Sequence, residues 1–199
     1  MPQDKNVISS IYSNKDGSPY YFIGDKALLK ESPVAVFCSR EIPLSIYHIA
    51  NETFTGILRL PIVIGGGWQS TMENRVLKNY NSESQAKIIC FLAKGINNFK
   101  IPLHLSRIMD YGRLLIVAPF IDKPRIDKKL VAVRNNLIFN LVDRFLFLYI
   151  KPEGQLESLF RRCLSDSKEV YLLEHKANIE YFVDRVKPFS SKNLKGLFI

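Results

Sequence analysis

The sequence has 199 residues, 47% of them hydrophobic, and this length favours one domain with a sizeable buried core. It contains no run of about twenty apolar residues and begins without the apolar segment of a secretion signal, so we expect a cytoplasmic protein with no membrane partner. Lysine and arginine number 28 against 19 aspartates and glutamates, and the resulting net charge of +9 favours an anionic partner, most simply a nucleic acid.

The cysteines and histidines lack the spacing of a disulfide framework or a metal site. Cys38, Cys90 and Cys163 lie far apart, and two of them fall within apolar runs, which is typical of reduced thiols in a core. None of the three histidines has a second ligand at metal-binding spacing. We therefore expect neither a metal centre nor a cofactor.

The first part of the chain leads into one strongly apolar strand. A polar lead-in ends in a turn at 14–18, and a short strand at 20–23 and one helical turn at 24–29 follow. Residues 34–38 are five consecutive apolar residues, which predicts a strand buried on both faces, as in a parallel sheet. Apolar residues then recur at helical spacing and predict a helix over 44–58.

A strand, a glycine turn and a helix are predicted next. The short apolar run at 61–64 predicts a strand, and the three glycines at 65–67 predict a turn. Serine and threonine can cap a helix that continues to residue 80. A third buried strand is predicted at 87–93, ending in a polar turn at 94–98.

The middle of the chain continues the alternation of helices and strands. We expect a helix at 101–110, a strand at 114–118 and a loop at 119–127. A helix at 128–143 and a strand at 145–150 follow.

The last part begins with a polar turn at 151–154, a helix at 155–164 and a strand at 169–173. Beyond it the pattern weakens, and we expect a helix at 179–186 and a tail at 190–199 with apolar residues at its end.

Strands that alternate with helices at this spacing predict an α/β fold. We expect a Rossmann-like, doubly wound, mostly parallel sheet in a single domain, with helices on both faces. Its expected limits are an N-terminal extension with a short strand at 1–30, the Rossmann-like domain at 31–175, and a C-terminal helix and tail at 176–199.

Two features at predicted strand ends suit a phosphate. Ser39 and Arg40 follow the strand at 34–38 directly, and ligands of open parallel sheets gather at the carboxyl ends of strands. The alternative is that Ser39 caps the next helix and Arg40 is a solvated charge. The glycines at 65–67 could let backbone N–H groups approach a phosphate at a helix N-terminus, or could only permit close packing of helix and sheet.

Several local signatures resemble those of one family. The run over 21–40, in which Gly24-Asp25 and Leu28-Leu29 precede the apolar strand and Ser39-Arg40, resembles the family of DNA processing protein A, also called Smf. This family belongs to a wider nucleotide-binding group that includes the LOG-type phosphoribohydrolases. The segment 134–138, Arg-Asn-Asn-Leu-Ile, is similar to the family's Arg-Asn-Arg-Ile-Ile. The resemblance covers about residues 20 to 173.

The resemblance implies a Rossmann-like fold and a function in DNA recombination and transformation. Members of the family bind single-stranded DNA in a basic pocket at the strand ends, form homodimers and help to load the RecA recombinase. Single-stranded DNA, a second copy of the chain and a RecA-type recombinase are therefore the partners that the resemblance implies.

This chain departs from the family pattern at several motif positions. Cys38 replaces a glycine, and Asn136 replaces the second arginine of the helix motif. Glu153 places a negative charge in a turn near the proposed anion site. The family's Val-Pro-Gly after the last strand is replaced by 173–175, Leu-Glu-His. These departures put altered or weakened DNA binding among the expectations.

The sequence does not favour an enzyme. The phosphoribohydrolases place an arginine on one helix and a glutamate after the following turn; Arg134 matches the first, but Ser158 stands where the glutamate is expected and Glu157 is one residue away. One residue turns a helical side chain by about 100°. No Ser-His-Asp set or Walker lysine motif is recognisable. Hydrolysis of a nucleoside phosphate is therefore the minority hypothesis.

Our leading hypothesis is a DNA-binding pocket at the strand ends. Trp68 could stack on a base, with Tyr111 behind it, or could anchor a helix in the core. Arg134 could bind phosphate or form an ion pair with a carboxylate such as Asp127. The expected phosphate-binding residues are Ser39, Arg40, Gly65, Gly66, Gly67, Trp68, Lys94, Asn97, Arg134, Asn135 and Lys151.

A hypothesis of a different class is a nucleotide sensor or a scaffold. Its pocket would hold a small nucleotide or nothing, and its surface would serve a protein partner. The apolar end of the chain, Leu194, Leu197, Phe198 and Ile199, could dock on that partner or on a second copy, or pack on its own core.

Overall fold

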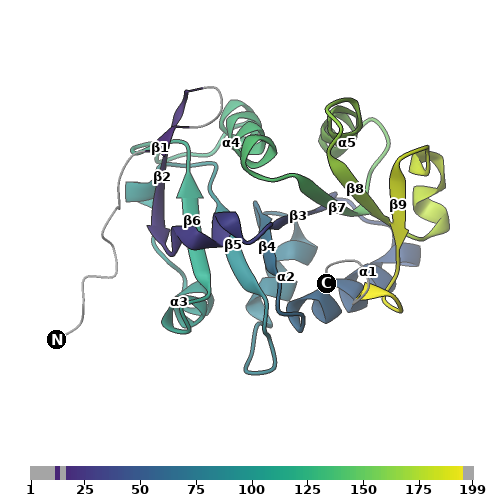
Figure 1. Cartoon of the computed structure of the whole chain (residues 1–199), viewed down its shortest axis with the longest axis horizontal. Helices are drawn as coiled ribbons and strands as arrows, with labels where there is room; N and C mark the ends of the chain where they lie inside the picture. Colours follow the sequence, from purple (N-terminus) through teal and green to yellow (C-terminus); the bar gives the residue numbers. More distant parts are fainter. Residues whose placement is uncertain (1–11, 14–16, 195–199) are drawn as a thin grey trace.

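The protein is described here by a computed structural model that covers residues 12–13 and 17–194. These residues form a nine-stranded sheet between two layers of helices (Figure 1). The strands are β1 (Tyr12–Ser13), β2 (Pro19–Gly24), β3 (Val34–Cys38), β4 (Val63–Gly66), β5 (Lys87–Phe91), β6 (Leu114–Ala118), β7 (Arg144–Tyr149), β8 (Glu169–Leu173) and β9 (Val186–Phe189).

The helices lie on both faces of this sheet. The α-helices are α1 (Leu44–Leu58), α2 (Thr71–Lys78), α3 (Leu103–Asp110), α4 (Lys128–Leu141) and α5 (Gln155–Ser165), and the 3₁₀ helices are η1 (Lys26–Lys30), η2 (Ile96–Asn98) and η3 (Lys176–Tyr181). Figure 1 shows α4 and α5 on one face and α1, α2 and α3 on the other. The predicted α/β, doubly wound architecture is confirmed.

The order of the strands makes β3 the centre of the fold. It is β1-β2-β6-β5-β4-β3-β7-β8-β9, and all the pairs from β6 to β9 are parallel. From β3 the chain therefore winds outward to β6, then returns through α4 to place β7 on the other side of β3. The two antiparallel pairs of the described sheet both involve β2, which pairs with β1 on one side and with β6 on the other, where Tyr21 lies opposite Ala118.

The alternation of side chains in β3 shows why this strand is apolar throughout. Val34, Val36 and Cys38 pack into the core under α1, α2 and α3, whereas Ala35 and Phe37 face the core under α4 and α5. The Phe37 ring stacks on those of β7, with ring centroids 6.2 Å from Phe145 and 5.7 Å from Phe147. Both faces of the strand are therefore covered, as parallel sheets require.

Two of the predicted elements need correction. The helix expected at 179–186 is wrong: η3 ends at Tyr181, and Val186 to Phe189 form β9, which pairs with β8. Gly65 and Gly66 are not a turn, because β4 continues through both. An added Cβ would lie 2.9 Å from the Phe91 ring at Gly65 and 3.1 Å from the Val36 carbonyl oxygen at Gly66, so close packing accounts for these two glycines.

Segments on both sides of the predicted domain limits, residues 31 and 175, belong to the sheet. The sheet takes in β2 from the N-terminal extension and β9 from beyond residue 175. Leu194 is buried, and its Cδ1 lies where a side chain at Gly56 of α1 would begin. The lead-in up to residue 11, the turn at 14–18 except for its last two residues, and the apolar residues 197–199 fall outside the described residues, whereas residues 12–13 of the lead-in form β1. None of the helices within the described part is long and apolar enough to cross a membrane.

Candidate functional site

The largest concentration of predicted site residues lies where the chain reverses its direction of winding. α1 leaves β3 toward one face of the sheet, and α5 leaves the neighbouring β7 toward the other (Figure 1). Such a switch point opens a crevice at the carboxyl ends of parallel strands. Here it holds a pocket of about 340 Å³, which we call the switch-point pocket. It collects six of the predicted residues: Ser39, Arg40, Gly67, Arg134, Asn135 and Lys151.

Ser39 ties the ends of β3 and β7 together. Its backbone N–H donates to the Tyr149 carbonyl at 3.0 Å, and its Oγ accepts from the Lys151 N–H at 2.9 Å. The register between the two strands shifts between Phe37 and Cys38, just before this residue. Since Oγ acts as an acceptor here, its own proton is left to donate toward a ligand in the pocket.

Arg134 of α4 forms the floor of the pocket and is almost completely buried, with 5% of its surface exposed. A Cβ at Gly67 would lie 1.5 Å from one of its terminal nitrogens, so the glycine is needed to make room for the guanidinium. The side chain donates to Asn135 Oδ1 at 2.8 Å, and more weakly to the Phe91 carbonyl at 3.4 Å and Gln69 Oε1 at 3.5 Å.

No carboxylate oxygen among the described residues lies within 4 Å of Arg134. The partner considered from the sequence, Asp127, instead caps α4 by accepting from the Leu130 N–H at 2.8 Å. Burial lowers the pKa of Arg134 to about 10; nearby Glu73 opposes this effect and Arg40 adds to it. The guanidinium therefore remains charged at neutral pH and has only neutral hydrogen-bond partners.

The Glu73 carboxylate takes up backbone N–H groups beside the predicted glycine turn. It accepts from the backbone N–H groups of Cys38 at 3.0 Å, Gln69 at 2.9 Å and Ser70 at 3.1 Å. Ser70 Oγ accepts from the Glu73 N–H in return and completes a capping box. Burial raises the pKa of Glu73 against these hydrogen bonds and Arg134, which lower it. The N–H groups of Gln69 and Ser70 at the start of α2 thus already donate to a carboxylate, whereas a phosphate contact from the glycines 65–67 stays a prediction.

The charges at the rim of the pocket are partly paired. Lys151 forms an ion pair with Glu41; hydrogen bonding to Lys151, and then its charge, lowers the pKa of Glu41. Glu153 also lines the pocket, with a left-handed φ of 58°. Arg40 is exposed and makes no ion pair within the described part of the chain. Three cations thus face three carboxylates, and Arg40 and Arg134 are the two cations without a carboxylate of their own.

The remaining predicted site residues lie outside the pocket. Trp68 is buried, donates from Nε1 to the Ile89 carbonyl at 2.9 Å and stacks on Phe54 with ring centroids 5.8 Å apart, so its expected role in base stacking is wrong. Lys94 lies over the Phe99 ring, and Asn97 donates to Asp122. Both follow β5, which is two strands away from β3, so their loop opens away from the switch point.

Two further depressions adjoin the switch-point pocket, and the sequence analysis missed both. The first, of about 780 Å³, runs along α2 and shares Arg40, Gln69 and Ser70 with the pocket. The second, of about 290 Å³, lies between α4 and α5. We call the three together the strand-end groove. Its charged lining residues are the cations Arg40, Arg75, Lys78, Lys128, Arg134, Lys151 and Arg162 and the carboxylates Glu41, Glu73 and Glu153.

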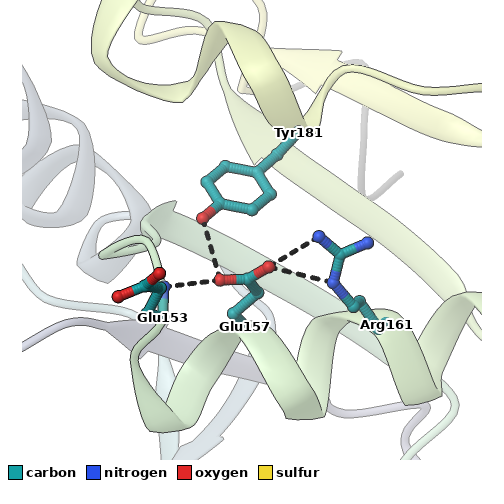
Figure 2. Close-up of polar contacts among 4 residues, drawn as sticks. All are labelled: Glu153, Glu157, Arg161 and Tyr181. Carbon is teal, nitrogen blue, oxygen red and sulfur yellow. Dashed lines mark hydrogen bonds and ion pairs between the residues drawn. The ribbon is translucent and has the colours of Figure 1, made fainter.

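Glu157 lies outside this groove and holds one of its loops in place. Its carboxylate accepts from the Glu153 N–H at 2.7 Å and from the Tyr181 hydroxyl at 3.3 Å, and Arg161 pairs with its other oxygen (Figure 2). It lines none of the three depressions, whereas Ser158 lines the one between α4 and α5. The structure thus directs this glutamate away from the position that the hydrolase hypothesis requires.

Comparison with solved structures identifies similar folds. The chain superposes on DNA processing protein A from Streptococcus pneumoniae with a TM-score of 0.73, at 16% identity over 98% of this chain and 76% of that one. DNA processing protein A from Helicobacter pylori, described by its single-stranded DNA binding mode, superposes with a TM-score of 0.71, at 16% identity over 96% of both chains. A molybdenum cofactor binding protein from Rippkaea orientalis superposes with a TM-score of 0.54, at 15% identity over 84% of this chain and 94% of that one.

No protein-family model and no curated protein sequence matches the chain. The structural likeness nevertheless shows that the chain has the fold of DNA processing protein A.

Proposed function

We propose that this protein binds single-stranded DNA through its phosphate backbone in the strand-end groove, and that it is a binding protein rather than an enzyme. The observation that carries this proposal is Arg134, a charged guanidinium on the floor of the switch-point pocket with no carboxylate within 4 Å among the described residues. Arg40 stands above it at the rim. Two arginines that converge on one hollow are suited to a phosphate group.

The fold supports this assignment. The similar protein from Helicobacter pylori binds single-stranded DNA, and the net charge of this chain favours an anionic partner. The lining of the groove has seven cations and three carboxylates, and two of these carboxylates are already engaged, Glu73 by backbone N–H groups and Glu41 by Lys151.

The depth of Arg134 favours a single strand over a duplex. With only 5% of its surface exposed, it can be reached only by a phosphate that enters the pocket. A flexible single strand can bend a phosphate into a hollow of about 340 Å³. The stiffness of a duplex, whose persistence length is about 150 base pairs, keeps its phosphates on the rim.

The lining also predicts how the strand is recognised. Among the residues that line the groove, the aromatic ones are Phe37 and Trp68, and both are buried, so no ring is presented for base stacking. Phosphate contacts carry no sequence information. We therefore expect strong salt dependence and little preference among bases.

Fluorescence anisotropy with a labelled oligo-dT tests the proposal. For about three phosphate contacts, affinity should fall roughly 20-fold between about 50 mM and about 200 mM salt. Arg40→Ala and Arg134→Ala should each weaken binding about tenfold, whereas Lys30→Ala at the opposite edge of the sheet should not. Absence of binding at low salt, or equal affinity of all three variants, would remove the proposal.

Competition experiments separate the alternatives. Duplex DNA should compete poorly for the site. Displacement of the oligonucleotide by a nucleoside monophosphate at similar concentration would favour the nucleotide sensor, and release of free base would favour the hydrolase. Association with a second copy of the chain and with a RecA-type recombinase remains a prediction that rests on the family resemblance.

A further inference from the structure

We infer that a bound strand leaves the switch-point pocket across α2, where Arg75 and Lys78 form a second phosphate subsite. This inference rests on the proposed function, because it extends the same groove. It concerns the depression of about 780 Å³ along α2, which we call the α2 depression.

The α2 depression is continuous with the switch-point pocket. Arg40, Gln69 and Ser70 line both, so a phosphate held by Arg40 is already at the entrance to the second hollow. The next phosphates of the strand can then follow α2. Arg75 and Lys78 lie one turn apart on this helix, at the i and i+3 spacing that places side chains on one face.

The charges in the α2 depression are more favourable to an anion than those in the pocket. Arg40, Arg75 and Lys78 line it, and no carboxylate does. Arg75 and Lys78 are both exposed. Arg75 donates to the Tyr47 hydroxyl of α1 at 3.0 Å, a neutral partner that orients the guanidinium and leaves its charge available.

The other exit from the pocket, between α4 and α5, is less suitable. It has about 290 Å³ and two cations. Arg162 there has a neutral hydrogen-bond partner, as Arg75 does: it donates to Asn136 Oδ1 at 2.6 Å, and its guanidinium lies 3.8 Å from the centroid of the Phe139 ring. Gln155 lines both hollows, and Glu153, two residues before it, lines the pocket, so a strand leaving that way would pass near a carboxylate.

The rest of the α2 depression suits a nucleotide backbone. Thr71, Asn74 and Asn79 offer a hydroxyl and two amides for phosphate and sugar oxygens. Ile126, which is half exposed, gives an apolar surface on which a base can rest without being identified. The ligand expected here is therefore the continuing backbone of a single strand.

A length series of oligo-dT tests this inference. We would measure binding of strands of about three and about twelve nucleotides, the first below and the second within the range of about 4 to 16 nucleotides that single-strand binding modules cover. In the wild type, the longer strand should bind more tightly because it reaches the α2 depression. Arg75→Ala/Lys78→Ala should weaken binding of the long strand by about tenfold or more, as expected for two lost phosphate contacts, and should leave the short strand unchanged.

A matched control removes two charges elsewhere. Lys30 and Arg185 are exposed and line none of the three depressions. Lys30 lies shortly before β3 and Arg185 directly before β9, so both are at the amino ends of the strands, at the opposite edge of the sheet. Lys30→Ala/Arg185→Ala lowers the net charge by the same amount, so it measures the effect of charge alone. Thermal unfolding of each variant, together with Arg75→Gln/Lys78→Gln, checks that the helix remains folded.

The outcomes distinguish failure of the α2 subsite from failure of the proposed function. Equal loss in the α2 and control variants, or a loss on the short strand as large as on the long one, overturns the α2 subsite and leaves the proposed function intact. Failure of Arg40→Ala to weaken either length, or failure of the wild type to bind, overturns the proposed function itself.

Discussion

Arg134 combines burial with a positive charge that no carboxylate within 4 Å balances among the described residues. A buried charge without a counterion costs stability, because the interior solvates it less well than water does. A functional site can retain such a residue when its ligand supplies the missing charge. At the residue scale, this arginine is the strongest sign of an anion site in the molecule.

Replacement of Arg134 by methionine should therefore separate stability from binding. Arg134→Met keeps most of the volume and removes the charge, so the variant should be as stable as the wild type or up to about 3 kcal/mol more stable, while DNA binding falls at least tenfold. Thermal unfolding and anisotropy measure the two effects. A strongly destabilised variant would show that Arg134 holds the fold together instead.

The pH dependence of this comparison follows from the lowered pKa. Below about pH 10 the side chain is protonated in both the folded and the unfolded chain, so the difference in unfolding free energy between wild type and variant should be constant from pH 6 to pH 9, roughly one pH unit or more below that pKa. Above about pH 10 the folded wild type loses the proton first, and the cost of the buried charge should decrease.

Glu41 has the opposite effect on a ligand. It pairs with Lys151 at the rim and withdraws that cation from the groove. Glu41→Gln should release Lys151 and remove one repulsive charge, and should therefore strengthen DNA binding severalfold at low salt and less at high salt. Anisotropy at two salt concentrations checks this. Weaker binding by the variant would mean that the ion pair itself positions a contact.

Some of the site residues could be identified from the sequence, and others could not. Ser39, Arg40, Arg134 and Lys151 could be chosen because each stands at the end of a predicted strand or in a recognisable motif. The role of Trp68 could not, since a tryptophan after a glycine run is equally compatible with a core anchor, which the structure shows it to be.

At the scale of elements, the loop over 151–154 is held by a clamp from α5. Glu157 accepts from the Glu153 N–H and from the Tyr181 hydroxyl of η3, so a single carboxylate joins the helix, the loop and the segment after β8 (Figure 2). Glu153 has a left-handed φ of 58°, a backbone conformation that residues other than glycine adopt only when the surrounding structure stabilises it. The clamp therefore contributes to the shape of the groove without touching a ligand.

Loss of this clamp should loosen the loop and weaken binding. In Glu157→Gln, amide exchange over 151–154 should accelerate and DNA affinity should fall severalfold. Arg161→Ala removes an exposed partner of Glu157 but leaves the loop contact, so it should change neither property. Unchanged exchange in Glu157→Gln would show that the turn holds itself.

The acidity of Glu157 gives the clamp a pH dependence. Hydrogen bonding from Arg161, and then from the Glu153 N–H, lowers its pKa below the ordinary value of 4.5. An acid whose pKa is lowered by folding adds stability above its unfolded value and loses it as the pH falls through the folded value. The stability difference from Glu157→Gln should be full at neutral pH and should fade below about pH 4.5.

Elements with strong local signals were predictable, and weakly marked ones were not. The apolar runs of β3 and β5 and the serine that caps α2 are local signals that the structure confirms. β9 has four residues including Pro188, and its strand conformation depends on pairing with β8, a contact that no local pattern announces. The glycine at position 66 likewise reflects a long-range contact, because the Val36 carbonyl of the neighbouring strand leaves little room for a side chain.

At the scale of the whole molecule, the strand order decides which strand ends share a site. The sequence predicts that several loops gather at one edge of the sheet, but not which of them are neighbours. Because β3 lies between β4 and β7, the loops after these three strands form the switch-point pocket, whereas the loop with Lys94 and Asn97 after β5 does not reach it. The alternation of strands and helices therefore predicted the fold, and the long-range pairing selected the site.

The whole fold also explains how a chain with mixed charges can present a basic groove. The Glu73 carboxylate accepts hydrogen bonds from backbone N–H groups of the pocket, and Glu41 forms an ion pair with Lys151, so two of the three carboxylates of the lining already have partners within the protein. Arg40, Arg75, Lys78 and Arg134 have no such carboxylate partners within the described residues. Binding of an anion therefore depends on how the charges are paired as well as on how many there are.

The most direct test of this account is a crystal structure of the protein with a short oligo-dT. The account predicts a phosphate group within hydrogen-bond distance of both Arg40 and Arg134 in the switch-point pocket, with the strand continuing toward Arg75. An oligonucleotide bound at the amino ends of the strands, or one that leaves Arg134 without contact, would contradict it.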